Sequence, residues 1–256
     1  MIRSIMTSKT GMNAQQERLD IISNNLANSS TYGYKKMTVG FKDLYQESLD
    51  RKGYPIYDKD ATMGIGTRTS DVYRDNSVGN LVTTGVSTNL TIDGEGYFKV
   101  FKSDGTEAYT RDGSFVIDSN GQLVDSYGNR VEIEFANGRS YNNTVLNDNN
   151  FIVGQDGTIY MNENNTSVEI GKLNIYTATG DNAFKSIGDN LFVAADGVQV
   201  RESNDYNIEQ GFLEGSNVDM GEEMVNMIVA QRTFQLVSKC MQTSDEMWGM
   251  INSMRR

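Results

Sequence analysis

Two glutamates, Glu132 and Glu134, have the type and spacing that could support catalysis. They lie two residues apart in the segment 131–135, so a β-strand there would place both carboxylates on one face. Carboxylate pairs catalyse glycoside hydrolysis, with one group acting as acid and the other as base or nucleophile. Exposed strand faces often carry such pairs without any catalytic role. The pair therefore leaves a glycan-cleaving enzyme only as an alternative interpretation.

The other residue types that usually carry chemistry are missing or isolated. No histidine occurs among the 256 residues, which removes the most common general base, proton shuttle and zinc ligand. Cys240 is the only cysteine; it cannot form an internal disulfide and is expected to pack as a small hydrophobic residue. The Asp-Gly steps lack the ligand spacing of a calcium-binding EF-hand loop. We therefore predict a non-enzymatic protein with no catalytic residue, no cofactor and no metal site.

Tyrosines offer a second alternative, a protein that binds cell-wall glycan by stacking its aromatic rings on sugar. The candidate side chains in the middle of the chain are Tyr97, Tyr109, Tyr127, Tyr141 and Tyr160. Tyrosine is also common in half-buried strands, where it packs against its neighbours. A glycan-binding module would not need the matched apolar repeats found at the two ends of this chain. Packing is therefore the favoured interpretation.

Charge and hydropathy exclude further classes of function. The chain has 34 acidic and 23 basic residues, a net charge of -11. The excess lies in residues 53–216, which hold 24 acidic and 11 basic residues, so binding to nucleic-acid phosphates is not expected. No run approaches the roughly 18 apolar residues of a membrane span, and the amino terminus lacks a secretory signal pattern. We predict no membrane insertion, and any export would use a route that reads the mature amino terminus.

Seven-residue apolar repeats at both ends indicate helices that assemble side by side. Residues 2–27 and a segment starting near Ser216 are predicted to be helical, the second about 35 residues and about 50 Å long. The repeated residues form the expected assembly seam: Ile5, Met12, Leu19, Leu26, Met220, Met227, Phe234, Met241 and Trp248. A stripe with this period is narrow, so it suits another helix better than a globular core.

The second predicted helix carries further features that bear on its neighbours. Ser216 and Asp219 resemble a capping box that would start the helix. Gln231, Ser238 and Asp245 are expected at the other seam positions, where polar residues fix register at a cost in stability. A second apolar set lies around the helix: Val225, Ile228, Val229, Leu236 and Val237. Two apolar faces predict neighbours on more than one side, with burial against a sheet as the alternative.

The middle of the chain has the pattern of an antiparallel β domain. Seven Asp-Gly or Asn-Gly steps favour turns with positive φ. Their glycines are Gly94, Gly105, Gly113, Gly121, Gly138, Gly157 and Gly197. Short β segments are expected at residues 97–101, 114–117, 131–135, 158–161 and 172–176. Turns at this spacing are typical of an antiparallel sheet or a partly closed barrel.

The predicted fold class is α+β, with the two terminal helices paired as a coiled-coil-like module flanking a mainly antiparallel β domain. Residues 1–30 and 216–256 form the predicted helical assembly domain, and residues 92–215 the β-rich outer domain. Residues 31–91 connect them with mixed structure, including a short helix around residues 41–49.

Both ends of the chain also resemble a known family. The runs Gly11–Asn28 and Gly215–Arg232 are similar to the amino- and carboxy-terminal signatures of bacterial flagellar rod and hook proteins. The matching signature residues are Asn24, Asn25, Leu26, Asn28, Asn217, Val218, Asp219, Glu222 and Glu223. Residues 92–98 and 109–115 are similar to segments that open the family's β domain. The resemblance spans nearly the whole chain, with departures such as Phe234, where the family often has tyrosine.

The resemblance implies a structural role in the flagellar basal body, within the cell envelope. Members of the family are exported without a cleaved signal peptide and polymerise into a helical tube that transmits torque and provides an export channel. A length of 256 residues fits the distal part of the rod best, with another rod or hook paralogue as the alternative. The implied partners are further copies of this chain, other flagellar rod and hook proteins, envelope ring components and the flagellar export apparatus.

Overall fold

The chain divides into two compact units. The computed structural model describes residues 2–44, 46–48, 62–136, 139–141, 144–147, 150–163, 166–180, 183–203 and 205–254. Unit 1 consists of Met1–Ala27, Met37–Tyr73 and Asp219–Arg256, and unit 2 of Asn28–Lys36 and Arg74–Val218. Within the described residues, two helices and mainly antiparallel sheets make the fold α+β, which confirms the predicted class.

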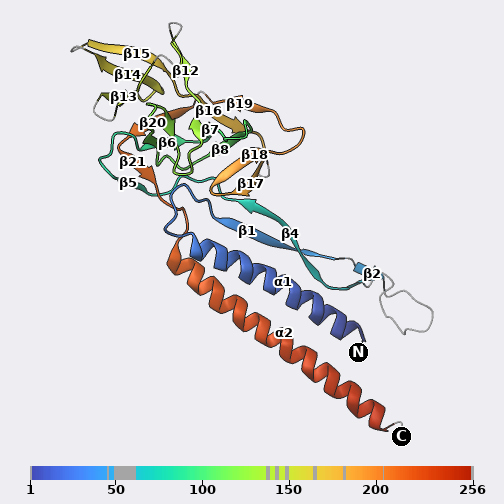
Figure 1. Cartoon of the computed structure of the whole chain (residues 1–256). Coiled ribbons are helices and arrows are strands. Elements are labelled where there is room, and N and C mark those ends of the chain that lie inside the picture. The colour runs from blue at the N-terminus through green and yellow to red at the C-terminus, as the bar shows by residue number, and fades with distance from the viewer. Residues whose placement is uncertain are drawn as a thin grey trace. The chain divides into compact units, whose positions relative to one another are not determined.

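Unit 1 combines two long helices with a β-ribbon (Figure 1). The helices are α1 (Ile2–Ala27) and α2 (Met220–Met254), and the strands are β1 (Met37–Asp43), β2 (Gln46–Ser48), β3 (Thr62–Gly64) and β4 (Thr67–Arg74). Strand β1 pairs with β4 and β2 with β3. The short helix predicted around residues 41–49 is therefore wrong where the structure describes it. Thr38 and Val39 favour extended backbone, and pairing with a second strand outweighs the weak helical pattern.

Helix α1 covers the predicted residues 2–27, whereas α2 begins later than expected, at Met220. Asp219 is the residue that caps it, because its Oδ1 accepts the N–H groups of Gly221 and Glu222 at 2.8 and 3.1 Å. The Ser216 hydroxyl instead accepts the N–H of Val218 at 3.3 Å, outside the helix. The predicted cap at Ser216 is thus wrong. An aspartate with a glutamate three residues later satisfies the free N–H groups of the first turn better.

Unit 2 is built from short antiparallel strands. Its larger sheet contains β7 (Tyr97–Phe101), β8 (Glu107–Thr110), β9 (Val116–Ile117), β10 (Leu123–Val124), β11 (Arg130–Val131), β16 (Ile175–Ala178), β17 (Phe184–Gly188), β18 (Leu191–Ala194) and β19 (Val200–Glu202). The other strands are β5 (Leu81–Thr83), β6 (Leu90–Gly94), β12 (Glu134–Phe135), β13 (Phe151–Val153), β14 (Thr158–Glu163), β15 (Thr166–Lys172), β20 (Tyr206–Gln210) and β21 (Phe212–Glu214). The larger sheet runs β17-β18-β8-β7-β11-β10-β9, with β16 joining β7 to β19. A second sheet runs β12-β15-β14-β13, and β6 and β5 pair with β20 and β21.

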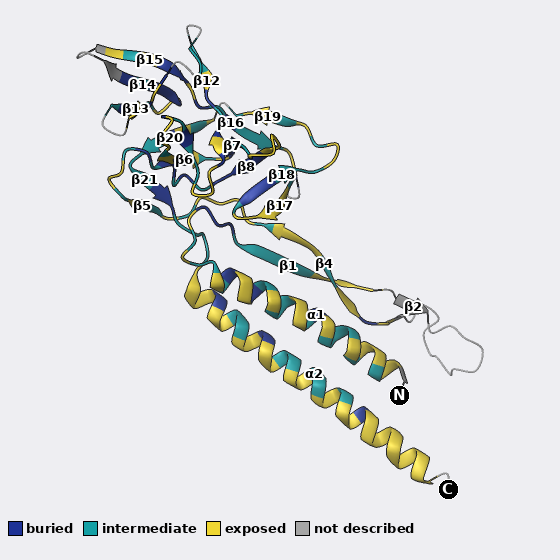
Figure 2. Ribbon diagram, viewed as in Figure 1, coloured by how far each residue is buried: buried dark blue, intermediate teal, exposed yellow. Residues whose placement is uncertain are grey.

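One apolar core holds most of these strands together. Leu90, Phe98, Phe115 and Ile175 are each at most 1% exposed, and the Phe98 and Phe115 rings meet edge to face with centroids 5.1 Å apart. Burying a side chain of this size contributes about 1.5–3 kcal/mol. Figure 2 shows that buried residues gather in unit 2 and are sparse along the two helices. Unit 2 therefore has the apolar interior of an ordinary domain.

The predicted strands are correct to different degrees. Residues 97–101 match β7, and residues 158–161 lie within β14. In the segment 114–117, only residues 116 and 117 form a strand, and Ser114 makes an isolated bridge with Asn89. The segments 131–135 and 172–176 each divide between two strands that belong to different sheets. Alternating residue types cannot reveal where a chain leaves one sheet for another.

The glycine steps serve two different purposes. Gly105, Gly121 and Gly157 have φ of 80°, 71° and 83° in turns that join antiparallel neighbours, and Gly197 has φ of 83° in a turn before β19, as predicted. Gly94 has a positive φ of 134°, as predicted, but it ends strand β6 and joins no hairpin. Gly113 makes no such turn, because its φ is not positive; it instead allows a close approach, since a Cβ placed on it would lie 1.5 Å from the carbonyl oxygen of Leu90. The predicted turns at these two glycines are wrong, and the turn at Gly138 lies outside the described residues.

Candidate assembly site

Helices α1 and α2 lie side by side in opposite directions, so that both chain ends lie at the same end of unit 1 (Figure 1). Three contacts fix their register. The Ser4 hydroxyl donates to the Ser244 hydroxyl at 3.3 Å. A Cβ added to Gly11 would lie 3.7 Å from the Val237 side chain. Asn25 Nδ2 donates to Glu223 Oε2 at 3.1 Å. Each step of seven or fourteen residues along α1 thus matches an equal step backwards along α2.

The line along which the helices meet is composed mainly of small or polar side chains. On α2 it follows Glu223, Ala230, Val237 and Ser244, of which all but the half-buried Val237 are buried. Small side chains let two helix backbones approach closely. Of the predicted polar seam residues, Gln231 and Asp245 are exposed and Ser238 is half-buried. The buried residues of α2 instead lie three positions after Met220, Met227 and Met241.

The predicted apolar stripe borders this contact line. Its half-buried members are Ile5, Met12, Leu19, Leu26, Met227, Phe234 and Met241, and its exposed members are Met220 and Trp248. None of the nine residues is fully buried in the chain by itself. The stripe therefore retains accessible apolar surface after the helices have paired.

Asn25 links three elements of unit 1. Its Oδ1 accepts the N–H of Met37 at 2.9 Å, and its Nδ2 donates to the Met37 carbonyl at 2.8 Å as well as to Glu223. Met37 is the first residue of β1. A buried asparagine with several partners fixes one alignment, because any shift would leave its amide unsatisfied. The signature residues Asn25 and Glu223, which are far apart in sequence, thus meet between the helices.

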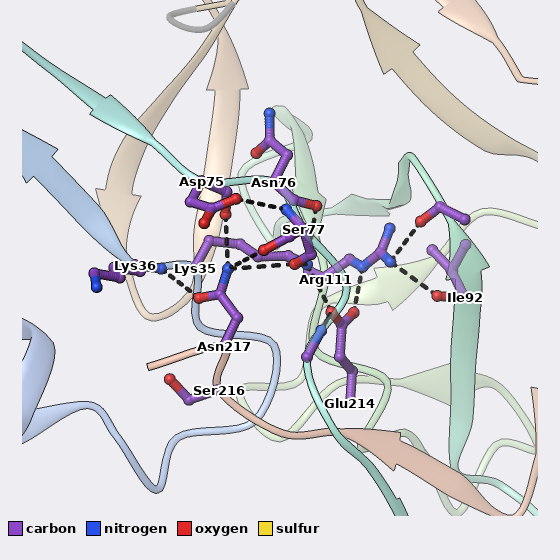
Figure 3. Close-up of polar contacts among 12 residues, drawn as sticks. Lys35, Lys36, Asp75, Asn76, Ser77, Ile92, Arg111, Glu214, Ser216 and Asn217 are labelled. Atoms are coloured by element: carbon purple, nitrogen blue, oxygen red, sulfur yellow. Dashed lines mark hydrogen bonds and ion pairs between the residues drawn. The ribbon is translucent and has the colours of Figure 1, made fainter. Parts of the chain in front are cut away.

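A cluster of buried charges, the Glu214 cluster, lies inside unit 2 (Figure 3). Lys35 Nζ lies 2.6 Å from Glu214 Oε1, Arg111 Nε pairs with Glu214 Oε2, and every one of these side chains is 2% exposed. Arg111 also donates to the carbonyls of Ile92 and Gly94 at 2.8 and 2.7 Å. The cluster therefore ties the first and last segments of unit 2 to its core. Sequence patterns did not indicate it, because lysine, arginine and glutamate are expected at the surface.

The charges in this cluster perturb one another. Burial alone would raise the pKa of Glu214, but the Arg111 and Lys35 cations and the Gly79 N–H outweigh it and hold the pKa below its ordinary value. Burial and the neighbouring Arg111 lower the pKa of Lys35, although Glu214 opposes them. The carboxylate is thus strongly favoured in its ionised form. Its role is to neutralise two buried cations.

Asn217 bridges three separate segments of unit 2, as Figure 3 shows. Its Oδ1 accepts the N–H of Lys36 at 2.7 Å, and its Nδ2 donates to the carbonyl of Asp75 at 2.9 Å and to that of Ser77 at 3.3 Å. The Asp75 N–H in turn donates to the Lys36 carbonyl at 2.9 Å. The signature asparagine therefore acts as a clasp for the segments on which unit 2 begins and ends.

The remaining signature residues lie at or next to the end of α1 and the start of α2. The Asn28 carbonyl accepts the N–H of Thr31 at 3.1 Å in the turn after α1. Asp219 caps α2, and Glu222 donates its N–H to that cap. Leu26 and Val218 are half-buried, and Asn24 is exposed. The signature thus contains at least three kinds of structural device: a cap, a clasp and a contact between helices.

The glutamates and tyrosines singled out in the sequence do not form a common site. Glu132 lies between β11 and β12 and accepts a hydrogen bond from the Tyr176 hydroxyl at 2.6 Å, whereas Glu134 lies on β12 and accepts one from Asn174 at 2.9 Å. The expectation that both occupy one strand face is wrong. Tyr97 and Tyr109 are buried against Phe192, so these two rings offer no surface for stacking. Neither helix in the described part of the chain is sufficiently long and apolar to cross a membrane.

Comparison with known proteins identifies the family. Three family models match the chain: "Flagella basal body rod protein" at residues 5–35, "Flagellar hook protein FlgE/F/G D1 domain" at residues 91–173 and "Flagellar basal body rod FlgEFG protein C-terminal" at residues 209–254. The flagellar basal-body rod protein FlgG of Borreliella burgdorferi is 36% identical, with 100% of both chains covered. FlgG of Bacillus subtilis is 33% identical, again over 100% of both chains. The chain therefore belongs to the flagellar basal-body rod protein family and is similar to FlgG proteins over its full length.

Proposed function

We propose that the protein is a structural subunit of the distal rod of the bacterial flagellum, where it polymerises into a helical tube. The tube transmits torque and encloses a channel for export. Relatives that align over their full length carry the name flagellar basal-body rod protein FlgG, which supports this assignment. The role is mechanical, and no chemical step is assigned to any side chain.

The observation that supports polymerisation best is an apolar surface on the side of α2 away from α1. This back face consists of Met224, Val225, Ile228, Val229 and Leu236. Val225 is 60% and Leu236 65% exposed. Val225 follows the buried Glu223 by two positions, about 200° around the helix at about 100° per residue. Contiguous apolar surface of this kind usually marks an interaction site.

The two helices are proposed to act together as a coiled-coil-like assembly module. Residues 1–30 and 216–256 form this module, residues 92–215 form the outer β domain, and residues 31–91 connect them. The seven-residue apolar repeats from Ile5 to Leu26 and from Met220 to Trp248 supply the assembly seam. Their incomplete burial within one chain supports contacts with further subunits.

The proposed partners follow from the same role. They are further copies of this chain, other rod and hook proteins, the envelope rings through which the rod passes, and the export apparatus that delivers subunits without a cleaved signal peptide. The proposed location is the flagellar basal body. An acidic unit 2 keeps unassembled subunits apart in solution by mutual repulsion.

Val225→Asp in the full chain is expected to abolish polymerisation and leave the monomer folded. A charge on the back face would be desolvated at a subunit contact, whereas an exposed position in the monomer tolerates it within about 0.5 kcal/mol. Sedimentation and electron microscopy measure assembly, and circular dichroism measures the fold. The matched control is Val116→Asp, since Val116 is 56% exposed on β9 of unit 2. Equal polymerisation of the two variants would contradict the proposed use of the back face.

A further inference from the structure

The last two turns of α2 continue past the described end of α1. Ser4 lies opposite Ser244, so Ile2, where α1 begins, lies opposite residue 246. Residues 247–254 of α2 therefore extend beyond the described part of α1 by about 12 Å at 1.5 Å per residue. We call these residues the overhang. Figure 2 shows the overhang exposed throughout.

The overhang is apolar on the side that α1 covers elsewhere. Ile251 continues the seven-residue series through Ala230, Val237 and Ser244 that faces α1, and Trp248 continues the bordering stripe. Trp248 is 45% and Ile251 50% exposed. The exposed apolar residues of the overhang are Met247, Trp248, Met250, Ile251 and Met254. The contact line between the helices thus continues into a surface of much larger side chains.

This change in side-chain size indicates a different kind of neighbour. Alanine and serine on the contact line admit a close helix, whereas tryptophan and isoleucine hold a partner further away and contribute more apolar area. The surface is continuous with the α1 contact, so it fits another helix. Residues 247–254 carry no charged side chain, so a charge on the partner helix would be buried at the contact without a counter-charge. The partner helix therefore needs an exposed apolar face that carries no charge.

The back face of α2 meets these requirements. The part of the back face from Met224 to Val229 carries no charged side chain, so docking there would desolvate no charge. Arg232, which is exposed, lies between this part and Leu236. The overhang and the back face lie at opposite ends and on opposite sides of the same helix. We propose that the overhang of one copy docks on the α2 back face of a second copy. The inference rests on the proposed function and specifies which surfaces the subunits use.

The pairing of unlike surfaces determines the form of the assembly. A contact between two different patches is heterologous, and when its rotation does not close it extends into an open filament. Overhang pairing with overhang would instead be isologous and would stop at a dimer. Docking of the overhang on the back face therefore agrees with a continuous tube.

Disulfide trapping in the full chain tests this contact directly. Cys240 is exposed, so the expectation that it packs as a small hydrophobic residue is wrong. Cys240→Ser provides the parent for single-cysteine variants. Ile251→Cys and Val225→Cys are purified separately, mixed under assembly conditions, oxidised mildly and separated without reductant. We expect a disulfide-linked dimer joining positions 251 and 225 to be the main crosslinked product of the mixture. Peptide mapping identifies the joined positions.

Matched controls show whether crosslinking is specific to the proposed contact. Ile187→Cys replaces an isoleucine that is 46% exposed on β17 of unit 2, and its mixture with Val225→Cys is expected to lack this dimer. Dimers formed as readily by Ile251→Cys alone would overturn heterologous docking, and so would equal crosslinking in the Ile187→Cys mixture. Polymers of the Cys240→Ser parent without the 251–225 crosslink would overturn the docking inference alone. A parent that forms no polymer would overturn the proposed function and the docking inference with it.

Discussion

Replacing Glu214 with alanine is expected to lower the free energy of unfolding of unit 2 by about 3–5 kcal/mol. Removing one partner of a buried ion pair leaves the other charge buried without a counter-charge. In this protein, both Lys35 and Arg111 would lose their buried counter-charge, and the side chain of each is 2% exposed. The Gly79 N–H, which donates to Glu214 at 2.8 Å, would also lose its acceptor. Chemical denaturation of the full chain, followed by the near-ultraviolet signal of its tyrosines, measures the change.

The same group gives unit 2 a defined dependence on pH. The folded pKa of Glu214 lies below its ordinary value of 4.5, so its contribution to stability is complete above that pH and is lost as the pH falls through the lower folded pKa. Glu214→Gln is therefore expected to differ most from the wild type at neutral pH, with the difference shrinking below pH 4.5. Glu202→Gln, at an exposed position on β19, is the matched control. A pH-independent difference would show that Glu214 acts through packing rather than charge.

Gly113→Ala is expected to destabilise unit 2 by about 3 kcal/mol, the upper end of the usual cost of overpacking. The new Cβ would meet the carbonyl oxygen of Leu90 at 1.5 Å. Backbone rather than a flexible side chain would have to move, and the hydrogen bond from the Leu90 N–H to the Gly113 carbonyl, 3.0 Å long, would be strained. Leu90 is fully buried, so the displacement would reach the core. Thermal unfolding measures the loss.

A glycine with open surroundings provides the comparison. A methyl group added to Gly249 in α2 would meet no atom within 4 Å, so Gly249→Ala is expected to stabilise the helix by about 1 kcal/mol through propensity. The two Gly→Ala changes should thus have opposite signs. Wild-type stability in Gly113→Ala would contradict the close approach to Leu90.

The family and the fold class could be predicted from the sequence because both depend on local patterns. The runs around Asn25 and Asn217 carry enough specific residues to identify the family, and the comparisons confirm it. The limits of α1 were predictable because Asn and Ser after Ala27 compete for backbone hydrogen bonds. The start of α2 was not, since Ser216 and Asp219 are both suitable caps and only the folded backbone selects between them.

The contact between the helices was predicted only in outline. Hydrophobic periodicity indicates which residues prefer to leave water, and it does not distinguish a partner within the chain from a partner outside it. Periodicity therefore indicates Met227 and Phe234, whereas the intrachain contact follows the smaller side chains of Ala230 and Val237. A search for small residues at the same seven-residue spacing would have found it.

The Glu214 cluster could not have been predicted from local sequence. Lys35 and Glu214 are 179 residues apart, and their spacing follows no helix or strand period. Only the topology of unit 2 brings them together. Arg111 lies in a run similar to the family's β domain, but a family resemblance does not indicate that a charged side chain is buried.

The Asn217 clasp has a mechanical consequence. The chain passes between the two units at residues 27–28, 36–37, 73–74 and 218–219. Lys36, Asp75 and Asn217 lie beside three different crossings and are hydrogen bonded to one another within unit 2. Force applied through any one of these three connections is therefore shared with the other two, so it does not act on one segment of unit 2 alone. The three connections between the units therefore resist force together, and a rod made of such subunits would resist local unfolding of unit 2 when it is twisted.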